Sequence, residues 1–121
     1  MQFYVDGDRL NCEVSSRSTD VYTGLPYDIG FFSFVNELVY SKIKKDKYPT
    51  LTLGDTTMKT TFTQIYDKSA RQALALKNSY QDKIGVFDIM PDIDDPDTVL
   101  QDILDNTANS SVIQWINNKA E

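Results

Sequence analysis

The stretch that decides the fold is QFYVDGDRLNCEVSSRSTD, residues 2–20. Apolar and polar side chains alternate over residues 2–6 and 10–15, on either side of a short turn that contains Gly7. Such alternation about a glycine-containing turn is typical of a β-hairpin with one buried face. Leu10, Cys12 and Val14 then share the buried face, and Cys12 is expected to be a small core residue.

The residues after the hairpin predict a long helix. Pro26 marks the turn into the helix, Asp28 can cap it, and it is expected to run to about Lys44. This is the most hydrophobic helix of the chain, and we expect it to form the centre of the core. Its inner face should carry Phe31, Phe34, Val35, Leu38, Val39 and Ile43.

The remaining segments predict further strands and helices. Residues 48–62 are rich in threonine and predict extended structure, interrupted at Gly54 and Asp55. A charged amphipathic helix is expected over about 63–79 and a short strand over 83–89. Asp95 and Pro96 mark the start of a third helix, and residues 110–119 predict a fourth. Residues 1–121 are therefore expected to form a single α+β domain.

The composition is that of a soluble globular protein. The 121 residues are 40% hydrophobic and 25% charged, with a net charge of −6 and a pI near 4.5. Nucleic acids and anionic membranes require clustered Lys and Arg, so neither is an expected partner. A single cysteine and the lack of a long apolar run favour an intracellular, cytoplasmic location. The one basic run is best explained as cations facing the C-terminus of the long helix; it contains Lys42, Lys44, Lys45 and Lys47.

Catalytic and metal-binding side chains are scarce. Histidine is absent, which removes the commonest general base and the commonest metal ligand. Nothing near Cys12 would lower its thiol pKa, so no catalytic residue, cofactor or metal site is assigned. The aspartates at 92, 94, 95 and 97 could hold calcium, but they lack the glycine and terminal glutamate of the common calcium loop. Helix capping explains Asp95 and Asp97 without a metal.

A longer pattern runs through the first half of the chain. It consists of Q-F-Y-V at 2–5, R-S-x-D at 17–20, G-x-P-[FY]-[ND]-[IV] at 24–29, the long helix, and L-G-D at 53–55. In this order and spacing the pattern resembles the C-terminal half of the thymidylate synthase and deoxycytidylate hydroxymethylase family, over residues 1–66. The resemblance implies a partial fold of that family, in which the hairpin and a mixed sheet pack on the long helix, with extra C-terminal helices. Residues 67–121 match no part of the pattern and form a divergent tail.

The resemblance implies a site for a pyrimidine nucleoside monophosphate at Arg17, Ser18, Asp20, Gly24 and Asp28. Arg17 and Ser18 correspond to phosphate ligands of the family, and a guanidinium and a hydroxyl suit a phosphate dianion. Asp28 stands where the synthases have asparagine and the hydroxymethylases aspartate. Because a carboxylate accepts hydrogen bonds from the amino group of cytosine, the expected base is cytosine. Two simpler interpretations remain open: Arg17 pairs with Asp20, and Asp28 only caps the helix.

Several parts of the family's catalytic machinery are absent or changed. In the family the attacking cysteine lies a few residues before Q-F-Y-V, and because Met1 directly precedes Gln2 we expect this chain to lack it. Cys12 matches a strand cysteine of family members and not the nucleophile. Thr57 and Lys59 stand where the family has the histidine and tyrosine that hold the ribose. The resemblance therefore points to a catalytically inactive relative.

We expect a domain that works by binding a protein or a pyrimidine nucleotide. Surfaces left uncovered without the family's N-terminal half favour a protein partner or a homodimer. The alternative is the C-terminal half of a split deoxycytidylate hydroxymethylase completed by another chain. A third interpretation is a regulatory or inhibitory protein, as expected in a phage-infected bacterial host, whose acidic tail meets a basic surface. The aspartates of that tail are Asp88, Asp92, Asp94, Asp95, Asp97, Asp102 and Asp105.

Overall fold

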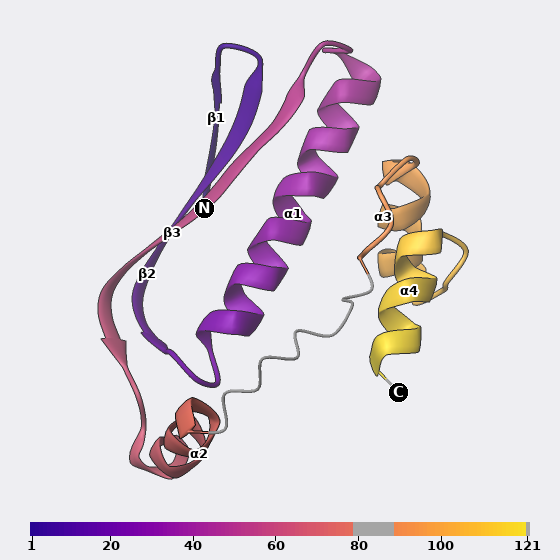
Figure 1. Cartoon of the computed structure of the whole chain (residues 1–121). Helices are drawn as coiled ribbons and strands as arrows, with labels where there is room; N and C mark the ends of the chain where they lie inside the picture. The colour runs from indigo at the N-terminus through magenta and orange to yellow at the C-terminus, as the bar shows by residue number, and fades with distance from the viewer. Residues whose placement is uncertain (79–88, 121) are drawn as a thin grey trace.

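The described part of the chain consists of a small sheet and four helices (Figure 1). The structure is a computed structural model, and it describes residues 1–78 and 89–120. The elements are β1 Gln2–Asp6, β2 Arg9–Asp20, α1 Leu25–Asp46, β3 Thr52–Gln64, α2 Asp67–Asn78, α3 Pro96–Asp105 and α4 Ser111–Ala120.

The sheet is mixed, and its strand order is β1-β2-β3. β1 and β2 form an antiparallel hairpin in which Phe3 lies opposite Cys12 and Val5 opposite Leu10. The hairpin turn has Gly7 at a φ of 62°, a conformation that glycine adopts without the steric cost of a side chain. β3 lies parallel to β2 along its other edge, and α1 connects the two. The predicted α+β class, the N-terminal hairpin and the mixed sheet beside a long helix are confirmed.

β2 extends further than the sequence predicts. The predicted strand ends at residue 15, whereas β2 continues to Asp20 because β3 pairs with it as far as Gln64. Arg17 and Ser18 therefore lie within a strand and not in a loop.

The predicted interruption at Gly54 and Asp55 is a β-bulge. After the Leu10–Leu53 pair, β3 uses one residue more than β2 before pairing resumes. The side chain of Asn11 supports the bulge, because its Oδ1 accepts the backbone N–H of Asp55 at 3.0 Å. A Cβ on Gly54 would lie 2.5 Å from the carbonyl oxygen of Leu10. The bulge in this conformation therefore requires glycine.

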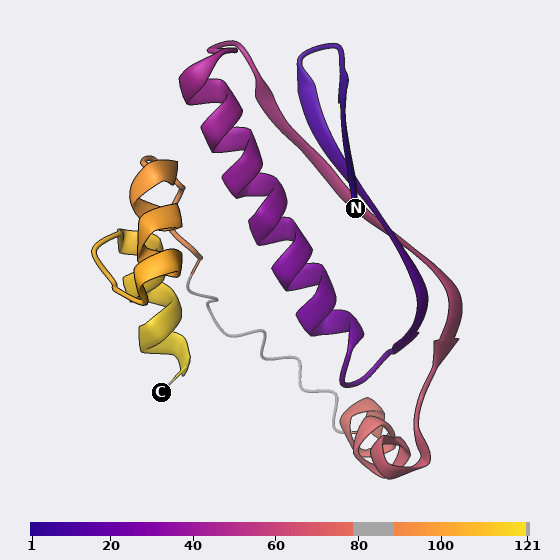
Figure 2. The same cartoon turned by 180° about the vertical axis from the view of Figure 1, so that it is seen from behind.

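α1 lies between the sheet on one side and the α3–α4 pair on the other, and both views show this order (Figures 1 and 2). On the sheet side, Leu10, Cys12 and Val14 are 2%, 1% and 4% exposed, so their predicted burial is confirmed. On the other side, α1 packs against α3, α4 and the segment before α3. The hydrophobic core cluster on this side contains Leu38, Ile93, Val99 and Val112, with Phe34, Met90 and Ile113 packed against it.

α1 begins earlier than predicted. Its N-cap is Gly24, which offers no side-chain cap, and Pro26 lies in the first turn as expected. Asp28 lies one turn inside the helix, where its backbone N–H donates to the Gly24 carbonyl at 2.9 Å. The prediction that Asp28 caps the helix is wrong, because the tight turn after Asp20 leads directly into helical geometry.

The predicted inner stripe of α1 is only partly covered. Residues Phe34, Val35, Leu38, Val39 and Ile43 are buried or half-buried. Phe31 is 61% exposed, so its predicted burial is wrong. The α3–α4 pair packs against Phe34 and Leu38, and Phe31 lies beyond that contact toward the helix N-terminus.

The later helices differ from their predicted bounds mainly at α2. The helix expected from residue 63 begins at Asp67, because β3 continues to Gln64. α3 has Asp95 at its N-cap position and Pro96 in its first turn, as predicted, and α4 lies close to its predicted place. Nearly all of the strand predicted over 83–89 lies outside the described residues. None of the described helices combines the length and the apolar character that crossing a bilayer demands.

Candidate functional site

Arg17 and Ser18, the predicted phosphate ligands, are exposed on the second half of β2. β1 pairs only with residues 9–13 of β2, so the edge of β2 beside Arg17 carries no strand among the described residues. Successive side chains of a strand point to opposite faces, so these two do not converge on one face of the sheet. A phosphate could contact both only at the strand edge.

Asp20 organises the turn between β2 and α1. Its Oδ1 accepts the backbone N–H groups of Tyr22 and Thr23, at 2.9 and 2.6 Å, and the Thr23 hydroxyl at 2.8 Å. Its Oδ2 accepts the backbone N–H of Tyr66 at 2.9 Å. Hydrogen bonds from the N–H groups of Thr23 and Tyr66 are the main reason that the pKa of Asp20 falls to about 2. Both oxygens of Asp20 accept hydrogen bonds, and Arg17 forms no ion pair with this carboxylate. The interpretation that Arg17 pairs with Asp20 is therefore wrong.

Gly24 and Asp28 lie beside the same turn. A Cβ on Gly24 would lie 3.0 Å from Thr19 Oγ1 and 3.1 Å from the Asp20 carbonyl oxygen, which is tighter than ordinary van der Waals contact. The carboxylate of Asp28 accepts the Thr19 hydroxyl at 3.3 Å. The structure thus brings Asp20, Gly24 and Asp28 together around the turn. Thr19 is a partner that the sequence did not indicate, since its hydroxyl reaches Asp28 only after α1 has folded back along β2.

Cys12 lies in the core and is poorly suited to nucleophilic chemistry. It is 1% exposed, and burial raises the pKa of its thiol. Lys59, at a position where the family resemblance implies a ribose ligand, forms an ion pair with Glu13 on the neighbouring strand at 2.8 Å. Thr57, like Lys59, lies on β3 and is exposed. This ion pair gives Lys59 a contact within the sheet.

A cavity of about 520 Å³ lies at the other end of α1, between that helix, β3 and residues 92–94. Its lining includes Glu37, Tyr40, Leu53 and Asp92. Burial is the main reason that the pKa of Glu37 is raised, and the negative charge of Asp92 adds to this, while a hydrogen bond from the Ile93 backbone opposes it. Nothing in the sequence indicates this cavity, because its residues are far apart in the chain and meet only when α1 packs against the segment before α3.

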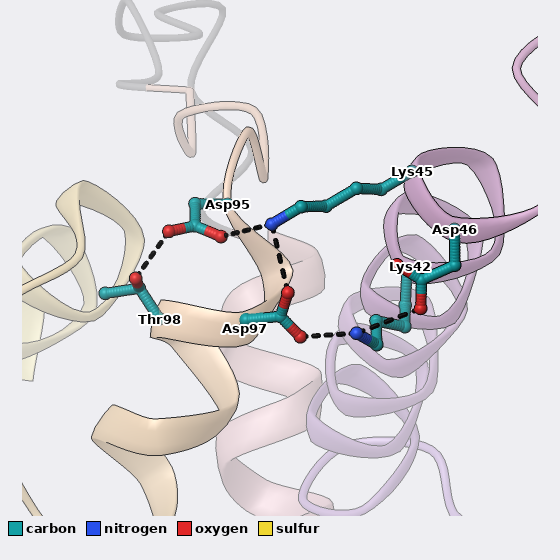
Figure 3. A network of polar contacts seen from close by, with 6 residues as sticks. All are labelled: Lys42, Lys45, Asp46, Asp95, Asp97 and Thr98. Atoms are coloured by element: carbon teal, nitrogen blue, oxygen red, sulfur yellow. Dashed lines mark hydrogen bonds and ion pairs between the residues drawn. The ribbon is translucent and has the colours of Figure 1, made fainter.

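Ion pairs connect the end of α1 to the start of α3 (Figure 3), and Lys45 of this network also lines the cavity. Lys45 Nζ lies 3.0 Å from Asp95 Oδ1 and 3.0 Å from Asp97 Oδ2, and Lys42 also donates to Asp97. Hydrogen bonds from the Thr98 hydroxyl and from Lys45 lower the pKa of Asp95 to about 2. Hydrogen bonds to Asp95 and Asp97 raise the pKa of Lys45 to about 12. The basic run at the end of α1 thus meets the acidic start of α3.

The predicted acidic tail presents fewer free charges than its sequence indicates. Asp102 is 1% exposed, and its carboxylate accepts the backbone N–H groups of Asn109 and Ser110 at 2.9 and 2.7 Å. Burial alone would raise the pKa of Asp102, but these hydrogen bonds hold it well below its usual range. Asp102 therefore orders the connection between α3 and α4 and cannot meet an outside partner. Asp88 lies outside the described residues.

The calcium alternative receives no support from the arrangement of the aspartates. Over residues 1–78 and 89–120, no group of three or more His, Cys, Asp or Glu is placed to hold a metal ion. Asp95 and Asp97 face lysines instead.

What the chain does must be inferred from these contacts and exposed surfaces. No family model and no solved structure matches the chain.

Proposed function

We propose that this chain is a catalytically inactive domain of the thymidylate synthase and deoxycytidylate hydroxymethylase type that works by binding a protein. The observation that carries the proposal is the exposure of Tyr27 and Phe31 on α1, at 79% and 61%. These two residues share one helix face with Phe34 and Leu38, because the spacing 27, 31, 34 and 38 follows the helical repeat. Phe34 and Leu38 belong to the core cluster with α3 and α4, whereas the described residues leave Tyr27 and Phe31 mostly exposed.

The energy available from covering this face is substantial. An aromatic side chain buries about 150–250 Å². At the exposures given above, covering both rings would contribute roughly 7 kcal/mol before the costs of association are subtracted. A contiguous aromatic pair on a helix is a common anchor at protein interfaces.

The end of β3 lies at the same end of the molecule as the start of α1 (Figure 1), and it carries further exposed apolar residues. Phe62, at the end of β3, is 64% exposed, and Ile65 and Tyr66 are each 49% exposed. β3 is also an edge strand in the described sheet, so one row of its backbone groups is free for pairing. These features favour a protein partner over a purely solvated surface.

The side chains of the chain support the inactive part of the proposal. Covalent attack on a pyrimidine needs an accessible thiolate beside a base or a cationic group. The one cysteine is buried with a raised pKa, and the sequence contains no histidine. Binding is therefore the activity that these residues can provide.

Site-specific photocrosslinking tests the protein-binding proposal. A photoreactive phenylalanine analogue placed at residue 27 or 31 should give a covalent adduct with a protein in cells that express the chain. The matched control is residue 48, because Tyr48 is 60% exposed but lies beyond the C-terminal end of α1. Adducts at 27 and 31 that are no stronger than those at 48 would contradict the proposal.

The mass of the adduct identifies the kind of partner. A mass of twice the chain indicates a homodimer, and any other mass a different protein. An adduct with a chain that carries the family's N-terminal half, with its reactive cysteine, would replace the inactive domain with the split hydroxymethylase.

A pyrimidine nucleotide is a second candidate ligand, and one observation favours it. Arg17 is exposed and has no ion pair among the described residues, beside a turn that Asp20 holds in place. Deoxycytidine monophosphate at millimolar concentration should then raise Tm more than deoxyuridine monophosphate does, and Arg17→Ala should remove the shift. The control is Arg71→Ala, because Arg71 is exposed on α2. No shift in the unmutated protein would exclude this ligand.

A further inference from the structure

β3 is a long strand with one edge that no described strand pairs with. It stands at the end of the β1-β2-β3 order and pairs with β2 on its other side. The carbonyl of Gln64 accepts the backbone N–H of Val21 at 2.9 Å, so the backbone of Gln64 points toward the β2 side. Backbone groups alternate in direction along a strand, and those of Thr57, Lys59 and Thr61 therefore point to the free edge. Such an edge can pair with a further strand.

One face of β3 carries two opposite charges. Asp55 Oδ1 lies 3.3 Å from Arg9 Nη2, and Lys59 Nζ lies 2.8 Å from Glu13 Oε1. Arg9 and Glu13 are four residues apart on β2 and share one face of the sheet. Their two partners on β3 therefore share that face as well. Both partners are open to further contacts, because the side chains of Asp55 and Lys59 are 77% and 63% exposed.

An antiparallel second copy can meet both charges at one register. With a two-fold axis at Thr57, each Asp55 lies directly opposite Lys59 of the second copy. An axis at Asp55 or at Lys59 would instead place like charges opposite each other, which is destabilising. An axis at Thr56 or Met58 would leave both charges opposite uncharged residues. Charge complementarity therefore selects the axis at Thr57.

The same register extends the ion pairs of each chain into a network. Asp55 has Arg9 on one side and would gain Lys59 of the second copy on the other. That Lys59 already pairs with Glu13 of its own chain. The charges then alternate in sign from β2 of one copy to β2 of the other, and the two-fold axis produces this row twice. Opposite charges directly across an antiparallel pair stabilise it, whereas unmatched charges on an edge oppose pairing.

We propose that the free edge of β3 pairs antiparallel with the same edge of a second copy, about a two-fold axis at Thr57. The two three-stranded sheets then join into one continuous sheet. The contact uses β3 and not the aromatic face of α1. It therefore goes beyond the binding proposed for Tyr27 and Phe31, and either proposal can fail without the other.

Sedimentation velocity of the full chain tests the proposal. The contact is short, because the bulge at Gly54 bounds it, so concentrations up to about 1 mM are needed. The unmutated chain should show a monomer–dimer equilibrium. Asp55→Lys and Lys59→Asp should each weaken dimerisation at least about tenfold, because each places like charges opposite each other at two positions. An equimolar mixture of the two variants should restore the dimer, since opposite charges then face each other again.

Two charge reversals on α2 are the matched controls. Asp67→Lys and Lys77→Asp change the net charge by the same amounts at exposed positions away from β3, and they should leave the dimer unchanged. A monomer at every concentration would overturn the proposal. So would a dimer that survives either reversal on β3, or a mixture of the two β3 variants that stays monomeric. A dimer that persists in Asp55→Lys and gives photoadducts at residues 27 and 31 would place self-association on α1 instead.

Cysteine cross-linking tests the position of the axis and needs no charge reversal, so it decides the matter if a reversal unfolds the chain. In a hydrogen-bonded antiparallel pair the two Cα atoms at Thr57 lie about 5.5 Å apart, within the roughly 4.4–6.8 Å that a disulfide spans. Thr57→Cys should therefore form a disulfide-linked dimer under mild oxidation. Cys12 does not interfere, because it is 1% exposed.

The control for cross-linking is Thr61→Cys, an exposed position on the same face of the same strand. At the proposed register the two residues at 61 lie about 27 Å apart, the length of eight residues of antiparallel strand. Thr57→Cys should form the dimer at least about tenfold faster than Thr61→Cys. Equal rates, or no dimer from Thr57→Cys, would overturn the proposal.

Discussion

The carboxylate of Asp20 accepts the backbone N–H of Tyr66 at 2.9 Å, and so joins the end of β2 to the residues before α2. The same carboxylate holds the turn that starts α1. We predict that Asp20→Asn lowers Tm, because the amide nitrogen of Asn cannot accept hydrogen bonds and leaves backbone donors unpaired. The control is Asp67→Asn, an exposed aspartate that should leave Tm nearly unchanged. Thermal unfolding followed by circular dichroism measures both, and equal Tm values would contradict the role given to Asp20.

Stability should fall in acid over a defined pH range. The pKa values of Asp20 and Asp95 are lowered from 3.8 to about 2 in the folded protein. The unfolded chain therefore binds more protons than the folded chain between about pH 4 and pH 2, so the stabilisation present above pH 4 is lost as the pH falls through this range. Urea unfolding at successive pH values measures the loss. In Asp20→Asn the free energy of unfolding should fall less steeply as the pH is lowered. An unchanged pH dependence in that variant would show that Asp20 does not contribute to the loss.

Two glycine-to-alanine substitutions should have opposite effects. Gly54→Ala should destabilise the fold by about 1–3 kcal/mol, because the new Cβ would collide with the Leu10 carbonyl oxygen in the bulge. Gly30→Ala should stabilise it by about 0.5–1 kcal/mol, because Gly30 lies inside α1 and no side chain or other element lies within 4 Å of the new Cβ. Urea unfolding of both variants provides the measurement. Effects of the same sign would show that the bulge geometry does not constrain residue 54.

The thiol of Cys12 should react only when the fold opens. It is 1% exposed and its pKa is raised, so few thiolates are present and reagents cannot reach them. The rate of labelling by a disulfide reagent should therefore rise sharply on addition of denaturant. The reference is Ser15→Cys in a Cys12→Ala background, since Ser15 is exposed on the same strand. Comparable labelling of the two folded proteins would contradict the burial of Cys12.

The features that were predicted correctly depend on neighbours in the sequence. Alternation of side chains places Leu10, Cys12 and Val14 on one face, and Pro96 after Asp95 marks the start of α3. The end of β2 was missed because it depends on pairing with Gln64, far along the chain. Asp28 satisfies the local rule for a helix cap, but the turn that Asp20 stabilises places the N-cap at Gly24, four residues earlier.

The cavity and the ion pairs beside it depend on distant contacts throughout. Glu37 stands within an apolar stretch of α1 and gives no periodic signal of its own. It meets Asp92 only because Leu38 packs with Ile93 and Val99 on the neighbouring elements. The lysines at the end of α1 were correctly placed near a helix terminus, but their partners on α3 lie about 50 residues away and could not be predicted from local spacing.

β2 and β3 are adjacent in the sheet although α1 separates them in the chain. β2 is synthesised before β3, and its pairing is complete only after Gln64 has been added. Until then the nascent chain has an open strand edge and an apolar face at Leu10, Cys12 and Val14. Early folding of α1 over that face would cover it before β3 is added, because α1 contacts β2 and precedes β3 in the chain.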